Sequence, residues 1–562
     1  MNILFEGYKY DSAQLHTVLP DVYIQELAKG QAQIIHIGYL GPIPGTQGAQ
    51  ATVMLPKVFL SEDDKALGKY APEDFLALSS DSVLRAQLAH SGTLDFLFRV
   101  SVWLFQAIGQ FARRKKDSEL VQLTELHIVS RSGGAGRSAL ELIQSLLHFY
   151  REQQALLTFI KRYNTNQQRN INWSRTVNRT TAIFQKGNPV YTQPIVKQQH
   201  INYDEELIRL FISTLADLKK EYGFRIEINS IYEPLTKHTF NKFKQAPTRH
   251  LKQIRGRYFN DQLVRLWNLL HLYYEQAEQQ RAQSSKQEKT LVRNFNIVFE
   301  DMIDALLSDP FSARMPAKLK NQHDDKILDH LYEYKDLTSE SDTIYHIGDS
   351  KYYKIGNSVG KTSVYKQYTY ARNLIFENIK RHNNSTLPSP LRYRDEMTEG
   401  YNPTPNFFIS ANYDKMLSFS NPELKFKETH KPSYHFQDRL FDRDTLLLQQ
   451  YDINFLYVMA SYVSPKASEI ASFQSTSRKK FREQLLKYLD REYIFFEMKP
   501  KSWTLDEFIT MNFRRLIGKM YRPSSFTDSI MVAVPHHEAA LLQSEFEKSS
   551  TLTRWSPNDL VV

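Results

Sequence analysis

The stretch Thr343-Ile-Tyr-His-Ile-Gly-Asp-Ser-Lys351 decides the fold of this chain and most of its chemistry. Its apolar first half predicts a buried β-strand, and the strand ends on Asp349 and Lys351. Side chains two residues apart on a strand point to the same face of the sheet. The sequence therefore predicts a carboxylate and an ammonium group side by side at the edge of a sheet.

The flanking segments extend this strand into a strand, turn, strand, helix unit. Upstream, Leu328 to Tyr334 predicts a second strand, which opens on Asp329. Downstream, apolar residues recur at helical spacing from Val364 to Ile379, and Gln367 flanks that apolar face. The order of side chains along the unit is therefore an acid, an acid with a lysine two residues later, and an amide.

A further helix is predicted from Phe295 to Leu307, with Glu300 facing the coming sheet. Phosphodiester hydrolysis needs a hard cation, such as Mg²⁺, that carboxylate oxygens hold against the phosphate. A neighbouring ammonium orients the attacking water and offsets the charge of the transition state. The pattern Asp329, Asp349 and Lys351 thus favours a metal-dependent phosphodiesterase. The alternative is a surface strand end with a salt bridge.

The composition is that of a soluble multidomain protein, and its positive net charge is compatible with an anionic partner without establishing one. The chain has 562 residues, a formal net charge of +10 and no cysteines, which excludes disulfides and thiolate zinc sites. The first residues lack the pattern of a signal peptide. The most apolar stretch, Phe96 to Phe111, is too short to span a bilayer and contains Arg99 and Gln106. We therefore expect a cytoplasmic protein with no membrane contact.

The pattern along the chain predicts an α+β multidomain protein with four regions. Residues 1–165 begin with short strands, punctuated by glycine and proline turns, and then become helical. Residues 166–294 are predicted as a helical middle region that ends near a Gln-, Ser- and Lys-rich break. Residues 295–475 hold the α/β unit described above, and residues 476–562 form a C-terminal α/β extension.

The stretch 163–200 is polar and interleaves aromatic residues with basic ones, among them Trp173, Arg175, Arg179, Phe184 and Lys186. Such interleaving is typical of segments that contact a nucleic-acid backbone. It fits an exposed loop beside a helical bundle equally well.

A glycine-rich segment, Gly356-Asn-Ser-Val-Gly-Lys-Thr362, offers a different function at the exit of the unit. A nucleotide P-loop has four residues between its glycines, and here only three separate them. No convincing downstream strand ends in the aspartate that a magnesium-nucleotide site needs. A nucleotide-binding switch is therefore the weaker interpretation of this segment.

Two other motifs imitate a catalytic or metal site. Tyr493 to Lys499 is an apolar strand that ends in Glu497 and Lys499, but the segment before it predicts a helix rather than an acidic strand. His536-His-Glu538 suggests metal ligands, yet adjacent residues point apart on a strand or helix, so we expect a surface turn.

Several segments together resemble one known family. Phe299-Glu300, Asp329, His346 to Lys354 and Gln367 to Ala371 resemble the PD-(D/E)xK nuclease centre of McrC-like proteins, most closely the nuclease subunit of LlaJI-type restriction systems. Four further segments resemble that family from about residue 165 onward, namely Trp173 to Thr176, Asn202 to Asp204, Asp438 to Leu446 and Tyr451 to Phe455.

The resemblance implies a restriction-endonuclease-like PD-(D/E)xK domain that cleaves foreign double-stranded DNA with Mg²⁺. It implies a partner, an AAA+ GTPase similar to McrB, on which the N-terminal domain docks and whose GTP hydrolysis it stimulates. The alternative function is a non-catalytic DNA-binding or assembly subunit that keeps a decayed nuclease fold. Salt-sensitive DNA binding without cleavage would be expected of that alternative.

The resemblance also assigns roles to individual residues. Asp329 and Asp349 would be the magnesium ligands, and Lys351 would be the catalytic lysine. Gln367 would support the site and Glu300 would be a helix acid near the metal. Asp329 follows a leucine where the family has proline, which leaves Asp336 open as an alternative first acid.

Overall fold

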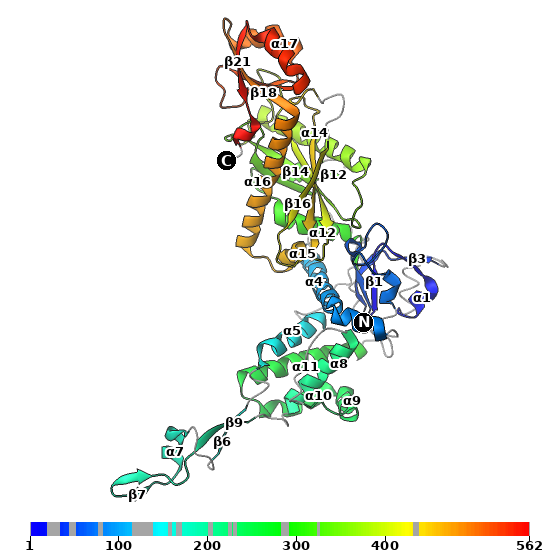
Figure 1. Ribbon diagram of the computed structural model, residues 1–562, viewed down its shortest axis with the longest axis vertical. Coiled ribbons are helices and arrows are strands. Elements are labelled where there is room, and N and C mark those ends of the chain that lie inside the picture. The colour runs from blue at the N-terminus through cyan, green and yellow to red at the C-terminus, as the bar shows by residue number, and fades with distance from the viewer. Residues whose placement is uncertain are drawn as a thin grey trace.

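The computed structural model describes residues 2–19, 34–43, 52–76, 82–114, 139–154, 160–164, 171–200, 206–222, 228, 233–282, 292–322, 326–430 and 438–560. These residues form the mixed α and β architecture that the sequence predicts. Figure 1 shows the largest sheet in the middle of an elongated molecule. A smaller C-terminal sheet lies at one end, and a helical region with a thin β arm lies at the other.

The central sheet has five strands in the order β13-β14-β15-β17-β16. The edge strand β13 (His330–Lys335) runs antiparallel to β14 (Thr343–Lys351). Next come β15 (Pro405–Asn412) and β17 (Leu447–Asn454), both parallel to β14, and then the antiparallel edge strand β16 (Leu424–His430). The strands that the sequence predicts at the central unit are therefore present.

Helices cover both faces of this sheet. One face packs on α14 (Lys361–Asn383), through a core that includes Tyr345, Ile347 and Phe408. The other face packs on three helices through a second core: α12 (Phe295–Leu307), α15 (Phe455–Val463) and α16 (Ala467–Glu492). Because both faces are covered, β14 is buried along nearly its whole length.

Gly348 is required for this packing. A Cβ atom at that position would lie 2.0 Å from the ring of Phe407 on the neighbouring strand. The glycine thus lets Phe407 pack flat against β14, just before the strand reaches its polar end.

The N-terminal region packs against the end of the central sheet. Its main sheet has the order β1-β5-β4-β10 and consists of β1 (Asn2–Phe5), β5 (Thr52–Leu55), β4 (Tyr39–Ile43) and β10 (Val292–Arg293). Other elements here are β2 (Lys9–Asp11), α1 (Ser12–His16), β3 (Ile34–His36), α3 (Ser82–His90) and α4 (Thr93–Arg114). Phe5 and Phe59 share one hydrophobic core with Phe299 and Phe455, so the two regions are joined by packing.

The region predicted as a helical middle holds most of its described helices in its second part. Its helices are α8 (Glu206–Tyr222), α9 (Lys237–Gln245), α10 (Pro247–Ile254) and α11 (Asp261–Ala282), which pack with α5 (Ala139–Glu152). Before them lies the arm of Figure 1, made of β6 (Ile160–Asn164), α7 (Trp173–Arg179), β7 (Ile183–Gln185), β8 (Asn188–Val190) and β9 (Val196–His200).

Hydrophobic periodicity does not predict the arm, because its β-hairpin depends on the conformation of the turn residues. Lys186 and Gly187 connect β7 to β8, and both have a positive φ, of 52° and 83°. Two consecutive residues with positive φ are typical of the two-residue turn that joins antiparallel strands. Trp173 and Phe184 on the arm are exposed, which agrees equally with contact to a nucleic acid and with an exposed segment beside a bundle.

The C-terminal sheet has the order β19-β20-β18-β21, formed by β19 (Met520–Tyr521), β20 (Ile530–Pro535), β18 (Tyr493–Pro500) and β21 (Ser550–Trp555), with helices α17 (Leu505–Leu516) and α18 (Ala539–Phe546). The predicted boundary at 475/476 falls inside α16, which continues without a break. Among the described residues, no helix has the length and apolar character needed to cross a membrane.

Candidate active site

The end of β14 carries the lysine and carboxylate that the sequence places on one face. Lys351 Nζ lies 2.5 Å from Asp349 Oδ2, and both side chains are largely shielded from solvent. The ammonium group also lies 5.3 Å from the centre of the Phe408 ring, on the next strand. The aromatic ring and the carboxylate together fix where the charge of Lys351 is held.

Asp329 is brought to the same place by the register of the sheet. It immediately precedes β13, and His330 pairs with Gly348, so Asp329 comes opposite Asp349. The Ser350 backbone N–H donates a 3.0 Å hydrogen bond to Asp329 Oδ2. The side chains of Asp329 and Asp349 are hydrogen-bonded to one another. Two acids from adjacent strands therefore touch at the sheet edge.

The alternative first acid, Asp336, lies elsewhere. It follows the other end of β13, and in the β13–β14 register it is separated from Asp349 by roughly 20 Å of strand. Its carboxylate accepts hydrogen bonds from the backbone N–H groups of Thr338 and Ser339 and from the amide of Asn402. Burial raises the pKa of Asp336 to about 7. It therefore organises the turn between the strands, away from Asp349.

Glu300 on α12 adds a third carboxyl group near the pair. Burial raises the pKa of Glu300 to about 7, and the charge of Asp349 adds to the effect. Burial, followed by the charges of Glu300 and Asp349, raises the pKa of Asp329 well above its usual range. Desolvation and like charge both disfavour ionised carboxylates. The site thus gathers carboxyl groups where water is largely excluded, which makes it costly to ionise all of them.

Gln367 on α14 is fully buried, and neither atom of its amide has a hydrogen-bond partner among the described residues. Its neighbours on the helix face the acids: Lys366 lowers the pKa of Glu300, and burial together with the charges of Asp329 and Asp349 raises the pKa of Tyr370. A buried amide without partners costs about 1–3 kcal/mol. Gln367 is therefore suited to contact a group bound in the site.

A network of side chains next to the two aspartates was not predicted from the sequence. His330 Nε2 lies 2.5 Å from Ser350 Oγ, and His330 Nδ1 lies 3.7 Å from Asp304 Oδ1. Lys320 Nζ lies 2.5 Å from that same oxygen. Asp304 is one helical turn beyond Glu300, which is the signal that could have found it. This network positions Ser350 through its hydroxyl group, and the backbone N–H of Ser350 donates to Asp329.

The ligand atoms of Glu300, Asp329 and Asp349 do not all lie within 4.8 Å of one another. In the described part of the chain, one group of three possible metal ligands has all its ligand atoms within 4.8 Å, and it is Asp438, His537 and Glu538. The acids at the end of β14 thus form a touching pair, with Glu300 acting on them through its charge.

The glycine-rich segment after β14 does not form a phosphate cradle. Gly356 has a φ of +96°, and the side chain of Glu62 from the N-terminal region fills the space beside it. Ile355 forms a β-bridge with Ser61 in the same region. A carboxylate next to the loop repels phosphate, so this segment serves to dock the N-terminal region.

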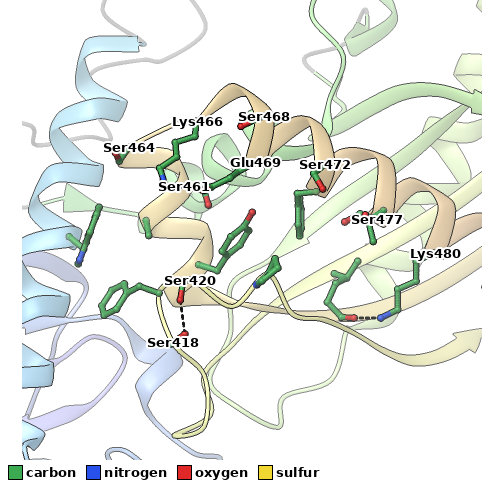
Figure 2. A pocket seen from close by; sticks show the side chains of 18 of the residues that line it. Ser418, Ser420, Ser461, Ser464, Lys466, Ser468, Glu469, Ser472, Ser477 and Lys480 are labelled. Atoms are coloured by element: carbon green, nitrogen blue, oxygen red, sulfur yellow. Dashed lines mark hydrogen bonds and ion pairs between the residues drawn. The ribbon is translucent and has the colours of Figure 1, made fainter.

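The site of Asp349 is distinct from a pocket of about 800 Å³ between α4, α15, α16 and the loop after β15. Figure 2 shows that serine hydroxyls and lysines line this pocket, including Ser472 and Lys480. Its cations are already engaged: Lys466 pairs with Glu469 at 2.8 Å, and Lys480 donates to the Leu424 carbonyl. None of the five predicted site residues lines it.

Comparison with known proteins gives one match. A family model described as LlaJI restriction endonuclease matches residues 104–396, a range that includes β13, β14 and the helices carrying Glu300 and Gln367. No curated protein and no solved structure matches the chain.

Proposed function

The chain belongs to the LlaJI restriction endonuclease family, and we propose that it cleaves foreign double-stranded DNA in a Mg²⁺-dependent reaction. The observation that carries the proposal is the contact of Asp329 with Asp349 beside the ammonium of Lys351. The order of acid, acid-x-lysine and helix glutamine along β13, β14 and α14 supports a PD-(D/E)xK nuclease fold.

The residues fit a divalent cation. Three carboxyl groups are gathered in a shielded place, two of them with raised pKa values, and one ammonium offsets only part of their charge. Hard cations such as Mg²⁺ are held by carboxylate oxygens. Asp329 and Asp349 would hold the ion, with Glu300 adding negative charge. Bound Mg²⁺ would polarise the phosphate and lower the pKa of a bound water.

The protein's own groups then orient the reactants and move protons. Lys351, fixed by Asp349, presents its ammonium to the attacking water and to the charge that develops on the phosphate. Glu300 has a pKa of about 7, which suits a group that accepts a proton from water near neutral pH. The Ser350 backbone N–H keeps Asp329 turned toward Asp349.

We further propose that an AAA+ GTPase similar to McrB supplies the energy for DNA translocation. The sequence contains no complete P-loop, so GTP hydrolysis belongs to another chain. Docking through the N-terminal domain would couple the two proteins, and the exposed Trp173 and Phe184 of the arm offer further contact surface for DNA or a partner. Such a complex would meet foreign DNA in the cytoplasm.

The test is cleavage of supercoiled plasmid by the chain together with its GTPase, with GTP and either Mg²⁺ or a chelator. Linear product with Mg²⁺ and none with the chelator is the expected result. Salt-sensitive DNA binding without cleavage, in Mg²⁺ and in Mn²⁺ alike, would instead establish the alternative of a non-catalytic DNA-binding subunit.

A further inference from the structure

A second polar cluster lies where the C-terminal sheet meets the loop before β17. The 3₁₀ turn η5 (His536–Glu538) follows β20 and brings His537 and Glu538 close to Asp438, a residue of that loop. The sequence predicts a surface turn here, and the structure has one. The expectation that adjacent side chains point apart is wrong for this pair, because the ligand atoms of His537 and Glu538 lie within 4.8 Å of each other.

The three side chains offer one imidazole nitrogen and two carboxylate oxygens. Their ligand atoms all lie within 4.8 Å of one another, with His537 exposed and the two acids half-buried. Zinc holds such atoms at about 2.0–2.2 Å in a tetrahedral arrangement, so two of its ligand atoms are about 3.4 Å apart. Small side-chain rotations would therefore close the cluster around an ion.

The local charge also favours a cation. Lys519 Nζ lies 2.5 Å from Glu538 Oε2, and this lysine is only 8% exposed. It balances the carboxylate of Glu538. Among the described residues, neither Asp438 nor His537 has a hydrogen-bond or ion-pair partner. Glu538 keeps its second oxygen for another ligand.

The cluster joins two parts of the molecule that already touch. The Phe441 N–H donates a 2.9 Å hydrogen bond to the Gly518 carbonyl, and the Tyr401 N–H donates one of 2.8 Å to the Phe441 carbonyl. Arg439 packs over Gly518, which has no room for a Cβ without crowding that side chain. An ion bound by Asp438 and by η5 would thus fasten the loop before β17 to the C-terminal sheet.

We propose that Asp438, His537 and Glu538 bind one divalent cation of the zinc class, which clamps the C-terminal sheet to the nuclease region. Imidazole nitrogen selects zinc and its transition-metal neighbours, whereas Mg²⁺ and Ca²⁺ take oxygen ligands. The site is separate from the acids at the end of β14, because different elements form it. It stands whether or not the chain cleaves DNA.

Zinc titration of the full-length, tag-free protein, stripped with a chelator, tests the proposal. Binding is measured by calorimetry in the Asp349→Asn variant. That substitution removes a carboxylate from the other acidic site, at the end of β14, so that zinc binding there does not mask the result. We expect about one Zn²⁺ per chain, and a Tm that rises with zinc because a ligand of the folded state stabilises it. His537→Ala should weaken the affinity at least about tenfold. The matched control is His536→Ala, an exposed neighbour in the same turn, which should bind zinc as its parent does.

Asp438→Asn provides the second arm, because it changes the other segment and leaves η5 intact. It should lose as much zinc affinity as His537→Ala and most of the zinc-dependent rise in Tm. Equal zinc binding by the parent and His537→Ala would overturn the proposal. So would undiminished binding by Asp438→Asn, since the clamp requires both segments.

Discussion

Two strands of this protein end in the same chemical pattern with different results. β14 ends in Asp349 and Lys351, and β18 ends in Glu497 and Lys499. Each strand is flanked by partners on both sides and is buried in its apolar part. Judged by the pattern of acid, any residue and lysine, the two strand ends are equivalent.

Their surroundings differ. Lys351 and Asp349 pair with each other, with side chains only 13% and 12% exposed, and Asp329 touches that pair. Lys499 instead pairs with Asp528 in solvent, with exposed fractions of 57% and 62%. Glu497 accepts a 2.6 Å hydrogen bond from Ser529 Oγ. The comparison teaches that the motif becomes a candidate site where the sheet register adds a second acid and helices exclude water.

The largest expected effect comes from removing the acid of each pattern in turn. Asp349→Asn should lower the rate of DNA cleavage at least about a thousandfold, because it removes a carboxylate that would hold the cation against the reacting phosphate. Glu497→Gln should leave the rate unchanged. Initial rates on a linear duplex with the GTPase partner measure both. A cleavage defect in Glu497→Gln equal to that in Asp349→Asn would erase the distinction between the strand ends.

A smaller effect on activity is expected from Glu300, which acts from α12 rather than from β14. Glu300→Gln should slow cleavage by roughly a hundredfold at neutral pH, the contribution of one acid–base group. The pH profile of the wild-type rate should bend near pH 7, the pKa of Glu300. That bend should be missing in the variant. A profile that is unchanged by the substitution would remove Glu300 from proton transfer.

Stability should change in the opposite direction from activity. The pKa of Asp329 is raised in the folded state, so its ionised form is destabilising there. The penalty is absent below the pKa of an unfolded aspartate, about 3.9, and grows as the pH rises above that value. Asp329→Asn should therefore raise the Tm by a few degrees at pH 7.5 and by nothing at pH 3.5.

Differential scanning fluorimetry in metal-free buffer measures this change, and Asp528→Asn at the exposed pair is the control. Exposed ion pairs contribute little to stability, so the Tm of the control should barely move at either pH. A fall in the Tm of Asp329→Asn at pH 7.5 would contradict the crowding of charge at the end of β14.

Much of the central unit could be predicted because its signals are local. An apolar run locates β14, and helical spacing places α12 at Phe295–Leu307 and Gln367 beside the apolar face of α14. The choice between Asp329 and Asp336 could not be made in this way. It depends on how β13 pairs with β14, and the length of the intervening turn does not show in hydrophobic periodicity.

The remaining features depend on contacts between distant segments. Nothing near Asp438 in the sequence points to His537, and nothing in the glycine-rich segment points to Glu62, which fills the space beside Gly356. The network of side chains likewise joins two strands and a helix, through His330, Ser350 and Asp304. Such groups meet only after the sheet register and the helix packing are fixed.

The most direct test compares the two lysines in one cleavage assay. Lys351→Ala and Lys499→Ala are incubated with the GTPase partner, GTP, Mg²⁺ and duplex DNA, after each variant has been shown to stimulate GTP hydrolysis as the wild type does. Lys351→Ala should yield no detectable cleavage, and Lys499→Ala should cleave at the wild-type rate. Cleavage by Lys351→Ala at the wild-type rate would contradict the assignment of the active site to the end of β14.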